Sequence, residues 1–289
     1  MAESPAHRFG QIIGELLESV ILPQLAAFCQ KQGLYLDHQK RIRPARTGKK
    51  VSWTDQYGNT HDLDFVIERD GTDEKVGTPL AFIESAWRRY TKHSRNKAQE
   101  IQGAILPLAE RYRWNNPFLG TVLAGVFTEG SLDQLRSLGF NVLYFPYESL
   151  IAAFKSEGVN IAFDESTPDR VFLQTTKRIE KASPKTISKV RAHLVNANQE
   201  AISVFFGALN KRLGRHVTRV VVTPLYGKAN EFATIEGAVK FLEQHHLNEG
   251  SSDFRKYEIR IEFSNGDKVE ASIEAKAKVK EFLAFVAKQ

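Results

Sequence analysis

Cysteine is almost absent from this sequence of 289 residues, which contains one cysteine and one methionine. The single Cys29 excludes an intramolecular disulfide, and its apolar neighbours Leu25 and Phe28 predict a buried thiol with a structural role. No apolar run approaches the roughly 18 residues that a membrane-spanning helix needs. The first ten residues, MAESPAHRFG, are polar and acidic, unlike a secretory signal. These features predict a cytoplasmic protein with no membrane partner.

Several widespread catalytic motifs are missing as well. The sequence has no Gly-rich phosphate loop, no Cys/His spacing typical of zinc sites and no G-x-S-x-G segment. These absences argue against P-loop nucleotide hydrolases, zinc-centred domains and α/β-hydrolases. No internal repeat or low-complexity tract occurs, and the length suits one large domain or two ordinary ones.

Positive charge is present in excess, and it is concentrated in two short segments. The formal net charge is +6, yet residues 39–51 and 85–99 contain no acidic residue at all. Positive charge gathered in this way suits a polyanion better than a generally basic surface does. The alternatives are a solvated linker for the first segment and an exposed helix for the second. The basic residues concerned are Lys40, Arg41, Arg43, Arg46, Lys49 and Lys50, then Arg88, Arg89, Lys92, Arg95 and Lys97.

The first half of the chain reads as helix, three strands, helix, strand, helix and strand. A hairpin that feeds a helix and then further strands predicts an α/β fold with a mixed β-sheet flanked by helices. The expected elements are a helix over 9–30, strands over 51–55, 61–69 and 80–86, a helix over 94–112, a strand over 121–127, a helix over 131–138 and a strand over 141–145.

The second half predicts a long helix followed by a small α+β unit. Ser183 and Pro184 form a cap and first turn, and apolar residues then recur with helical spacing for about eight turns until Gly214. A strand, a helix, a hairpin and a final helix follow. We therefore expect a core over 1–157, a helical bridge over 158–215, and a small unit over 216–289 for DNA recognition or oligomerisation.

Two carboxylates stand out in the predicted hairpin. Asp64 follows His61-Asp62-Leu63, and Glu84 follows Phe82-Ile83. A hairpin centred near Glu74 places Asp64 opposite Glu84. Two facing carboxylates among apolar residues repel each other and are desolvated unless a cation lies between them. Mg²⁺ prefers such oxygen ligands, so this pair predicts a magnesium site. A sheet-edge position or ion pairs with nearby arginines are the alternatives.

These residues and their setting resemble a known family. Asp64, a loop and then Glu84, in this order of elements, resemble the core of PD-(D/E)XK nucleases over roughly residues 8–147, most closely type II restriction endonucleases. The resemblance implies a restriction-endonuclease-like core, Mg²⁺ bound by Asp64 and Glu84, and water attack on a phosphodiester. The motif is short, and the order of helices and strands around it is the main support for the resemblance.

The sequence departs from the family at one position. Ala86 stands where these nucleases usually have a lysine that orients or polarises the attacking water. The helix expected after Glu84 offers a replacement, with Lys97 preferred over Lys92, and Glu100 as a further metal ligand on the same face. A catalytically weakened enzyme is the other reading of Ala86. Glu15 and Glu18 on the first helix are expected on a solvated face.

The expected partner is double-stranded DNA. Arg88, Arg89, Lys92, Arg43 and Arg46 are the expected contacts to its backbone, while Trp87 suits either base stacking or core packing. Cutting two strands with one site per chain implies a homodimer. A restriction setting adds a cognate DNA methyltransferase acting on the same site. A repair or junction nuclease is the second hypothesis, and a non-catalytic DNA-binding protein, favoured by Ala86, is the third.

Overall fold

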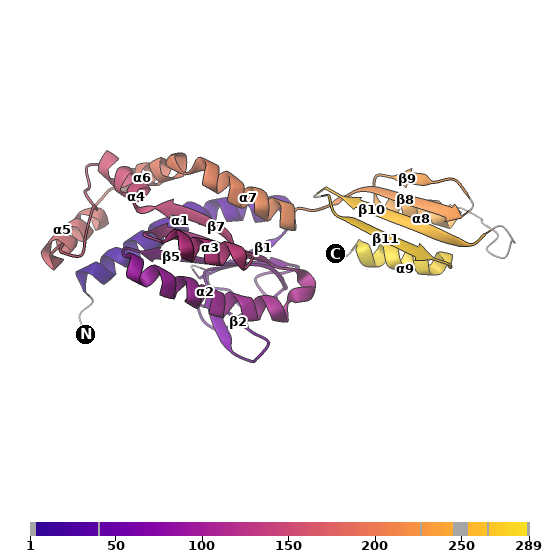
Figure 1. The fold of residues 1–289 in the computed structure, drawn as a ribbon, viewed down its shortest axis with the longest axis horizontal. Coiled ribbons are helices and arrows are strands. Elements are labelled where there is room, and N and C mark those ends of the chain that lie inside the picture. The colour runs from indigo at the N-terminus through magenta and orange to yellow at the C-terminus, as the bar shows by residue number, and fades with distance from the viewer. Residues whose placement is uncertain (1–3, 40, 226, 245–253, 265, 288–289) are drawn as a thin grey trace. The chain divides into compact units, whose positions relative to one another are not determined.

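The chain forms two compact units, Met1–Leu209 and Asn210–Gln289, each of which is described by itself. The computed structural model in Figure 1 describes residues 4–39, 41–225, 227–244, 254–264 and 266–287. A helical bridge was expected over 158–215. By their contacts, residues 158–209 of that range belong to the first unit.

A five-stranded mixed sheet organises the first unit, in the order β1-β4-β5-β6-β7. Strands β1, β4 and β5 pair antiparallel, whereas β5, β6 and β7 pair parallel. The parallel pairs require helical crossovers, which gives the α/β arrangement that the sequence predicts. The strands are β1 (Tyr35–His38), β4 (Phe65–Arg69), β5 (Thr78–Arg88), β6 (Phe118–Gly125) and β7 (Asn141–Pro146).

Helices cover both faces of this sheet. On one face, residues of α2 and α3 form an apolar cluster with Val66, Phe82 and Ala86. On the other, α1 packs against β5, where Phe9 meets Trp87 edge-on. The helices of this unit are α1 (Pro5–Gln32), α2 (Thr91–Arg111), the 3-10 helix η1 (Arg113–Asn115), α3 (Glu129–Ser137), α4 (Tyr147–Ser156), α5 (Asp169–Glu180), α6 (Pro184–Ala197) and α7 (Gln199–Leu213), whose residues after Leu209 belong to the second unit.

Helix α1 has well-defined ends. Ser4 Oγ accepts a hydrogen bond from the backbone N–H of His7 at 3.2 Å, Pro5 occupies the first turn, and Gly33 ends the helix at φ 66°. Among the described residues, α1 is the helix long and apolar enough to cross a membrane by length and composition. Its most apolar window is 44% buried inside the fold, and core helices pass the same test.

Several expected boundaries were wrong around the carboxylates. The strand expected over 61–69 is interrupted at Asp64, because β3 (Thr60–Leu63) pairs with β2 (Val51–Thr54) in a separate hairpin. Strand β1 was not expected, because its buried Asp37 interrupts the apolar pattern. The helix expected from Ser94 begins at Thr91, and Ser94 Oγ donates to the carbonyl of Thr91 at 2.8 Å within its first turn.

The single long helix expected over 184–214 was also wrong. It is divided into α6 and α7 at Asn198, whose side-chain Nδ2 donates to the carbonyl of Leu194 at 2.7 Å. Its Oδ1 accepts a hydrogen bond from Ser149 Oγ at 3.3 Å. A side chain that bonds to the backbone in this way competes with the helical ladder, which accounts for the break.

The second unit is a four-stranded antiparallel sheet with an α+β composition, as the sequence predicts. The strand order is β11-β10-β8-β9, and alternate residues such as Val220, Ile259 and Ile261 form one apolar cluster with the two helices. Its elements are β8 (Val217–Leu225), β9 (Asn230–Phe232), α8 (Ile235–Gln244), β10 (Lys256–Phe263), β11 (Lys268–Ile273) and α9 (Lys276–Val286).

Candidate active site

Asp64 lies between β3 and β4, and Glu84 lies within β5. The antiparallel register pairs Phe65 with Ile83, so the next position brings Asp64 beside Glu84. Both side chains are partly buried, and the charge of Asp64 raises the pKa of Glu84. Strand alternation places Asp64 on the same face as Val66, and Glu84 on the same face as Phe82 and Ala86, which is the face that α2 covers. The adjacency expected from the sequence is therefore present.

Asp64 is held by donors from two other segments. The backbone N–H of Ser85 donates to Oδ2 at 2.7 Å, and Nε2 of Gln39 donates to Oδ1 at 3.1 Å. Burial raises the pKa of Asp64, the Ser85 hydrogen bond opposes that shift, and the charge of Glu18 adds to it. Because each oxygen has its own donor, the Asp64 carboxylate is fixed in one orientation.

Glu84 is the more strongly perturbed of the two groups. Burial raises its pKa well above the usual value, the neighbouring charge of Asp64 raises it further, and the Lys97 ammonium opposes both. Both pKa values are raised because burial and a neighbouring carboxylate disfavour the ionised form of each group. The pair consists of hard oxygen donors, which fits a divalent cation such as Mg²⁺.

The stability of the cation-free protein is expected to fall as pH rises from about 4.5, the ordinary pKa of a glutamate. The folded pKa of Glu84 is raised, so its contribution is fully present below the unfolded pKa and is lost as pH rises through the folded value. Glu84→Gln removes this loss and flattens the profile. Denaturation in EDTA at a series of pH values, followed by tryptophan fluorescence, measures the free energy of unfolding of the wild-type protein and of Glu84→Gln. Parallel pH profiles for the two proteins would contradict a raised pKa of Glu84 in the folded state.

Lys97 lies on α2 beside the pair. Its positive charge lowers the pKa of both Asp64 and Glu84, and its side chain is only 21% exposed. The structure thus brings together the three residues expected to carry the chemistry. The backbone of Lys92 lies in the first turn of α2, but its side chain lies outside the described part of the structure.

Glu100 does not join the pair, which corrects the expectation that it supplies a metal oxygen. Its side chain is 59% exposed, with Oε2 lying 3.3 Å from Lys97 Nζ and 3.8 Å from Arg88 Nη2. These cations hold it on the outer side of α2. Across the described ranges, no three His, Cys, Asp or Glu side chains form a metal cluster. The additional carboxylate that acts on Asp64 is Glu18 of α1, which the sequence placed on a solvated face.

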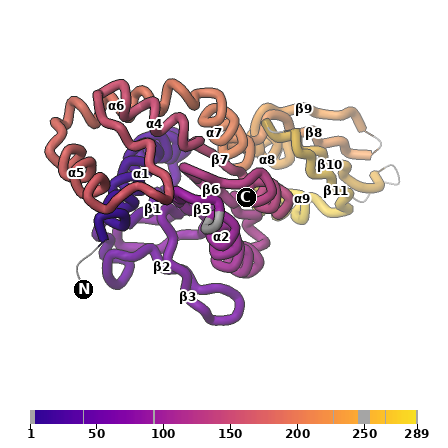
Figure 2. Tube along the Cα trace, turned by 60° about the vertical axis from the view of Figure 1, so that its left-hand side comes forward, coloured from indigo at the N-terminus to yellow at the C-terminus, as the bar shows by residue number. Residues whose placement is uncertain are grey.

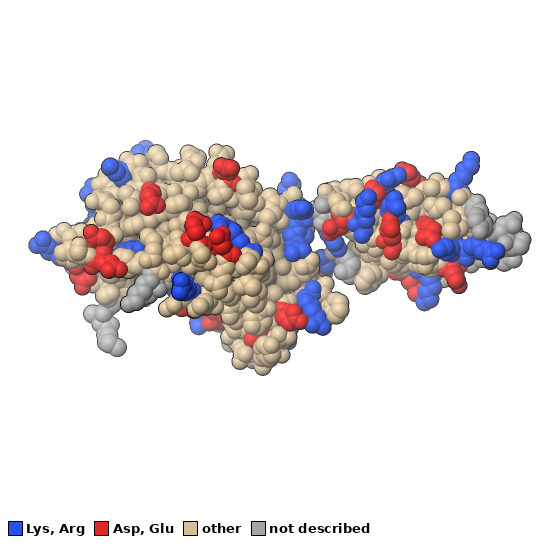
Figure 3. All heavy atoms as spheres, in the orientation of Figure 1, with Lys and Arg blue, Asp and Glu red and all other residues tan. Residues whose placement is uncertain are grey.

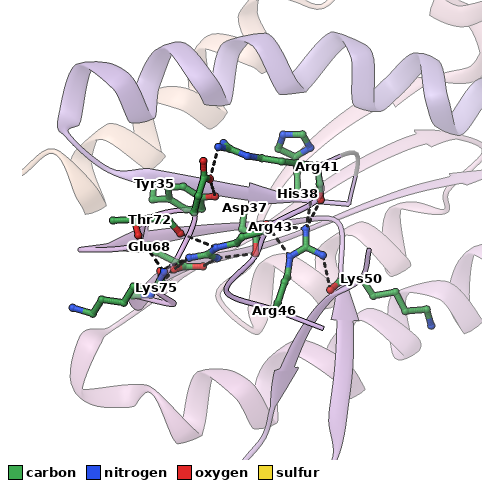
Figure 4. Close-up of polar contacts among 12 residues, drawn as sticks. Tyr35, Asp37, His38, Arg41, Arg43, Arg46, Lys50, Glu68, Thr72 and Lys75 are labelled. Atoms are coloured by element: carbon green, nitrogen blue, oxygen red, sulfur yellow. Dashed lines mark hydrogen bonds and ion pairs between the residues drawn. The ribbon is translucent and has the colours of Figure 1, made fainter. Parts of the chain in front are cut away.

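Arg43 is not a DNA contact, contrary to expectation, because it is 1% exposed. Its Nε donates to the carbonyl of Thr72 at 2.9 Å, and one Nη donates to that of Lys75 at 2.6 Å. The remaining N–H groups reach Asp37 Oδ2 at 2.8 Å and Glu68 at 2.6 and 2.9 Å. All five donors of the guanidinium are therefore used inside the protein, as Figure 4 shows.

Arg46 is likewise turned inward, which corrects its assignment to DNA. Its side chain is 10% exposed and donates to Asp37 Oδ1 at 3.2 and 3.0 Å. It also donates to the carbonyls of His38 at 3.0 Å, Arg41 at 2.9 Å and Lys50 at 2.7 Å. The basic segment after β1 is therefore folded around its own arginines (Figure 4). Lys40 of that segment lies outside the described residues.

The arginines after Glu84 remain partly accessible. Arg88 is 32% exposed, and Arg89 lies over the rings of Tyr90 and Phe172 at 4.3 and 4.2 Å. Trp87 packs edge-on against Tyr147 at 5.3 Å, so core packing accounts for it. On the face shown in Figure 3, basic side chains lie among acidic ones rather than in one continuous basic surface.

Comparisons with known proteins add little to this geometry. No family model and no curated protein match the chain. Among solved structures, the crystal structure of a protein of unknown function, AF1548, is 15% identical, with a TM-score of 0.29 over 66% of this chain and 98% of that chain. A TM-score this low does not establish a common fold.

Proposed function

We propose that this protein is a Mg²⁺-dependent endonuclease that hydrolyses phosphodiester bonds of double-stranded DNA. The observation that carries the proposal is the adjacency of Asp64 and Glu84, with Lys97 acting on both. The mixed sheet that positions them agrees with the resemblance to PD-(D/E)XK nucleases, whose specific core remains part of the proposal.

Each residue has a distinct part in this proposal. Asp64 and Glu84 hold the cation, and the donors from Ser85 and Gln39 keep Asp64 in the orientation that this requires. Mg²⁺ bound there would neutralise charge developing on the scissile phosphate and acidify an attacking water. Lys97 orients the water or holds its proton from the side of α2. Arg88, Arg89 and Lys92 follow Glu84 closely enough in the chain to contact the DNA backbone near the break.

A restriction enzyme is the biological setting that we propose first. It implies cytoplasmic location, a homodimer that cuts both strands, and a cognate methyltransferase that protects the same site. The second unit, Asn210–Gln289, has its own apolar core and is available for DNA recognition or dimerisation. A repair or junction nuclease uses the same centre but selects DNA by structure. A non-catalytic DNA-binding protein is favoured by Ala86 alone.

Incubation of supercoiled plasmid with the protein distinguishes these readings. Discrete bands in Mg²⁺, and none in EDTA, are expected for a restriction enzyme. Cleavage confined to branched or nicked substrates would favour the repair enzyme. Binding with no cleavage in either Mg²⁺ or Mn²⁺ would overturn the enzymatic proposal.

Replacing Lys97 by Met is expected to slow cleavage by about 100-fold or more, because a positioned acid or base typically contributes that much. Methionine keeps the apolar stem of the side chain and removes its charge. Cleavage rate at saturating DNA is the measurement, and Lys92→Met, in the preceding turn of α2, is the comparison variant. Full activity in Lys97→Met, with loss in Lys92→Met, would move the role to Lys92.

A further inference from the structure

Two aromatic side chains are unusually exposed in the first unit. Trp114 of η1 is 84% exposed and Tyr57 in the β2–β3 turn is 75% exposed, which makes them the most exposed aromatic rings among the described residues. Aromatic rings normally bury large apolar areas, and exposed ones are enriched at sites that bind other molecules. The two rings therefore need an explanation other than core packing.

The turn that carries Tyr57 is tightly organised. Asp55 Oδ1 accepts from the backbone N–H groups of Tyr57 at 2.8 Å and Asn59 at 2.9 Å. Its Oδ2 lies 2.9 Å from His61 Nε2, and Asp55 N–H donates to the carbonyl of Asn59 at 2.8 Å. An exposed ring on a turn fixed in this way loses little conformational freedom when it binds a partner.

The turn is attached to the end of α2, where Trp114 lies. Arg111 Nη1 donates to the carbonyl of Asp55 at 2.8 Å. Below the turn, Trp53 of β2 packs edge-on against Tyr112 at 5.5 Å and is itself 8% exposed. Figure 2 shows the β2–β3 hairpin projecting from the body of the first unit. The Arg111–Asp55 hydrogen bond and the Trp53–Tyr112 ring contact thus connect the segments that carry Tyr57 and Trp114.

Two arginines lie beside these rings. Arg113 Cζ lies 5.1 Å from the centre of the Trp114 ring, while its Nη1 is paired with Glu110 Oε1 at 2.5 Å. From Arg111 to Thr128 the sequence contains no acidic residue. Arg111 and Arg113 are both exposed. The hairpin runs through Leu63 directly into Asp64, on the face of the sheet that carries the carboxylate pair. Aromatic rings beside arginines are the combination that binds the bases and backbone of unpaired nucleic acid strands.

We propose that Tyr57 and Trp114 form a stacking platform for unpaired bases of a DNA substrate. Paired bases inside a duplex cannot offer their faces to such rings, so the platform selects DNA with a single-stranded or flipped-out segment. The inference rests on the proposed function in that the substrate is DNA. It does not depend on the chemistry at Asp64 and Glu84, because stacking needs no cation.

Binding is tested in EDTA, so that cleavage cannot interfere. Fluorescence anisotropy compares a blunt duplex with the same duplex carrying a single-stranded overhang. Tyr57→Ala and Trp114→Ala are each expected to weaken binding to the overhang DNA by roughly five- to 150-fold, the range measured for loss of base stacking. Binding to the blunt duplex is expected to change less than about twofold, the scale of an ordinary surface substitution. Tyr57→Phe and Trp114→Phe keep a ring and should keep the preference.

Val204→Ala is the control, because Val204 is an exposed apolar side chain (69%) in the first unit with no part in the proposed site. Equal losses for both DNA probes, the same loss in Val204→Ala, or unchanged binding in the double alanine variant would overturn the platform. In the last case, normal plasmid cleavage by that variant would leave the nuclease proposal standing. If the wild-type protein prefers overhang DNA but never cuts DNA in Mg²⁺ or Mn²⁺, the platform stands and the nuclease proposal fails.

Discussion

Glu84→Gln is expected to reduce DNA cleavage by at least about a thousandfold while leaving DNA binding intact. The substitution keeps the shape of the side chain and removes one of the two carboxylates available to a cation. A bound metal supplies several kcal/mol of transition-state stabilisation, and about 4 kcal/mol corresponds to a factor of a thousand. Asp64→Asn is expected to behave in the same way, because it removes the other carboxylate, which Ser85 and Gln39 hold in one orientation.

The measurement is the rate of plasmid nicking in Mg²⁺, with DNA affinity measured separately in EDTA. Glu100→Gln is the matched control on α2, since its carboxylate is 59% exposed and paired with Lys97 and Arg88. That variant is expected to retain cleavage within about tenfold, as expected when a residue outside the metal shell is changed. Near-normal cleavage by Glu84→Gln would show that the catalytic centre lies elsewhere.

Arg43→Met is expected to destabilise the first unit by about 3–5 kcal/mol, the cost of removing one partner from a buried ion pair. Asp37 and Glu68 are 1% and 0% exposed; the Arg43 guanidinium pairs with Glu68 and shares Asp37 with Arg46. Without it, both carboxylates lose hydrogen bonds that water cannot replace. Domains are stable by only about 5–15 kcal/mol, so a large share of the stability would be lost.

Chemical denaturation followed by tryptophan fluorescence measures this loss, because Trp53, Trp87 and Trp114 all lie in the first unit. Arg41→Met is the control from the same basic segment. Arg41 pairs with Asp73 at the surface, where ion pairs contribute about 0–1 kcal/mol. If Arg43→Met weakened DNA binding at unchanged stability, the sequence-based assignment of Arg43 to DNA would be restored.

The elements that could be predicted from the sequence are those with a strong local pattern. Helix α1 and strands β5, β6 and β7 have regular apolar periods, so they were located to within a few residues. Strand β1 and the break at Asn198 depend on interactions between distant segments. Asp37 is buried because Arg43 neutralises it, and Asn198 is bonded to Ser149 of another helix.

In the candidate site, too, the residues that could be predicted are those placed by a local pattern. Asp64 and Glu84 follow from strand alternation and hairpin register, and Lys97 from its place on the following helix. Gln39 and Glu18 could not be found in this way, since nothing local connects them to Asp64. Arg43 was expected at the surface because it belongs to a run of basic residues. Its burial depends on Glu68, a residue on a different strand.

Calorimetric titration of Mg²⁺ into the wild-type protein and into Glu84→Gln tests the central claim most directly. The account predicts that the wild-type protein binds Mg²⁺ and releases protons on binding, because a cation favours the ionised form of two carboxyl groups whose pKa values are raised in its absence. Proton release is read from titrations in two buffers with different ionisation heats. Glu84→Gln is expected to bind at least about tenfold more weakly, the scale of losing one oxygen ligand. Equal Mg²⁺ affinity in the two proteins would contradict the assignment of this pair as the metal centre.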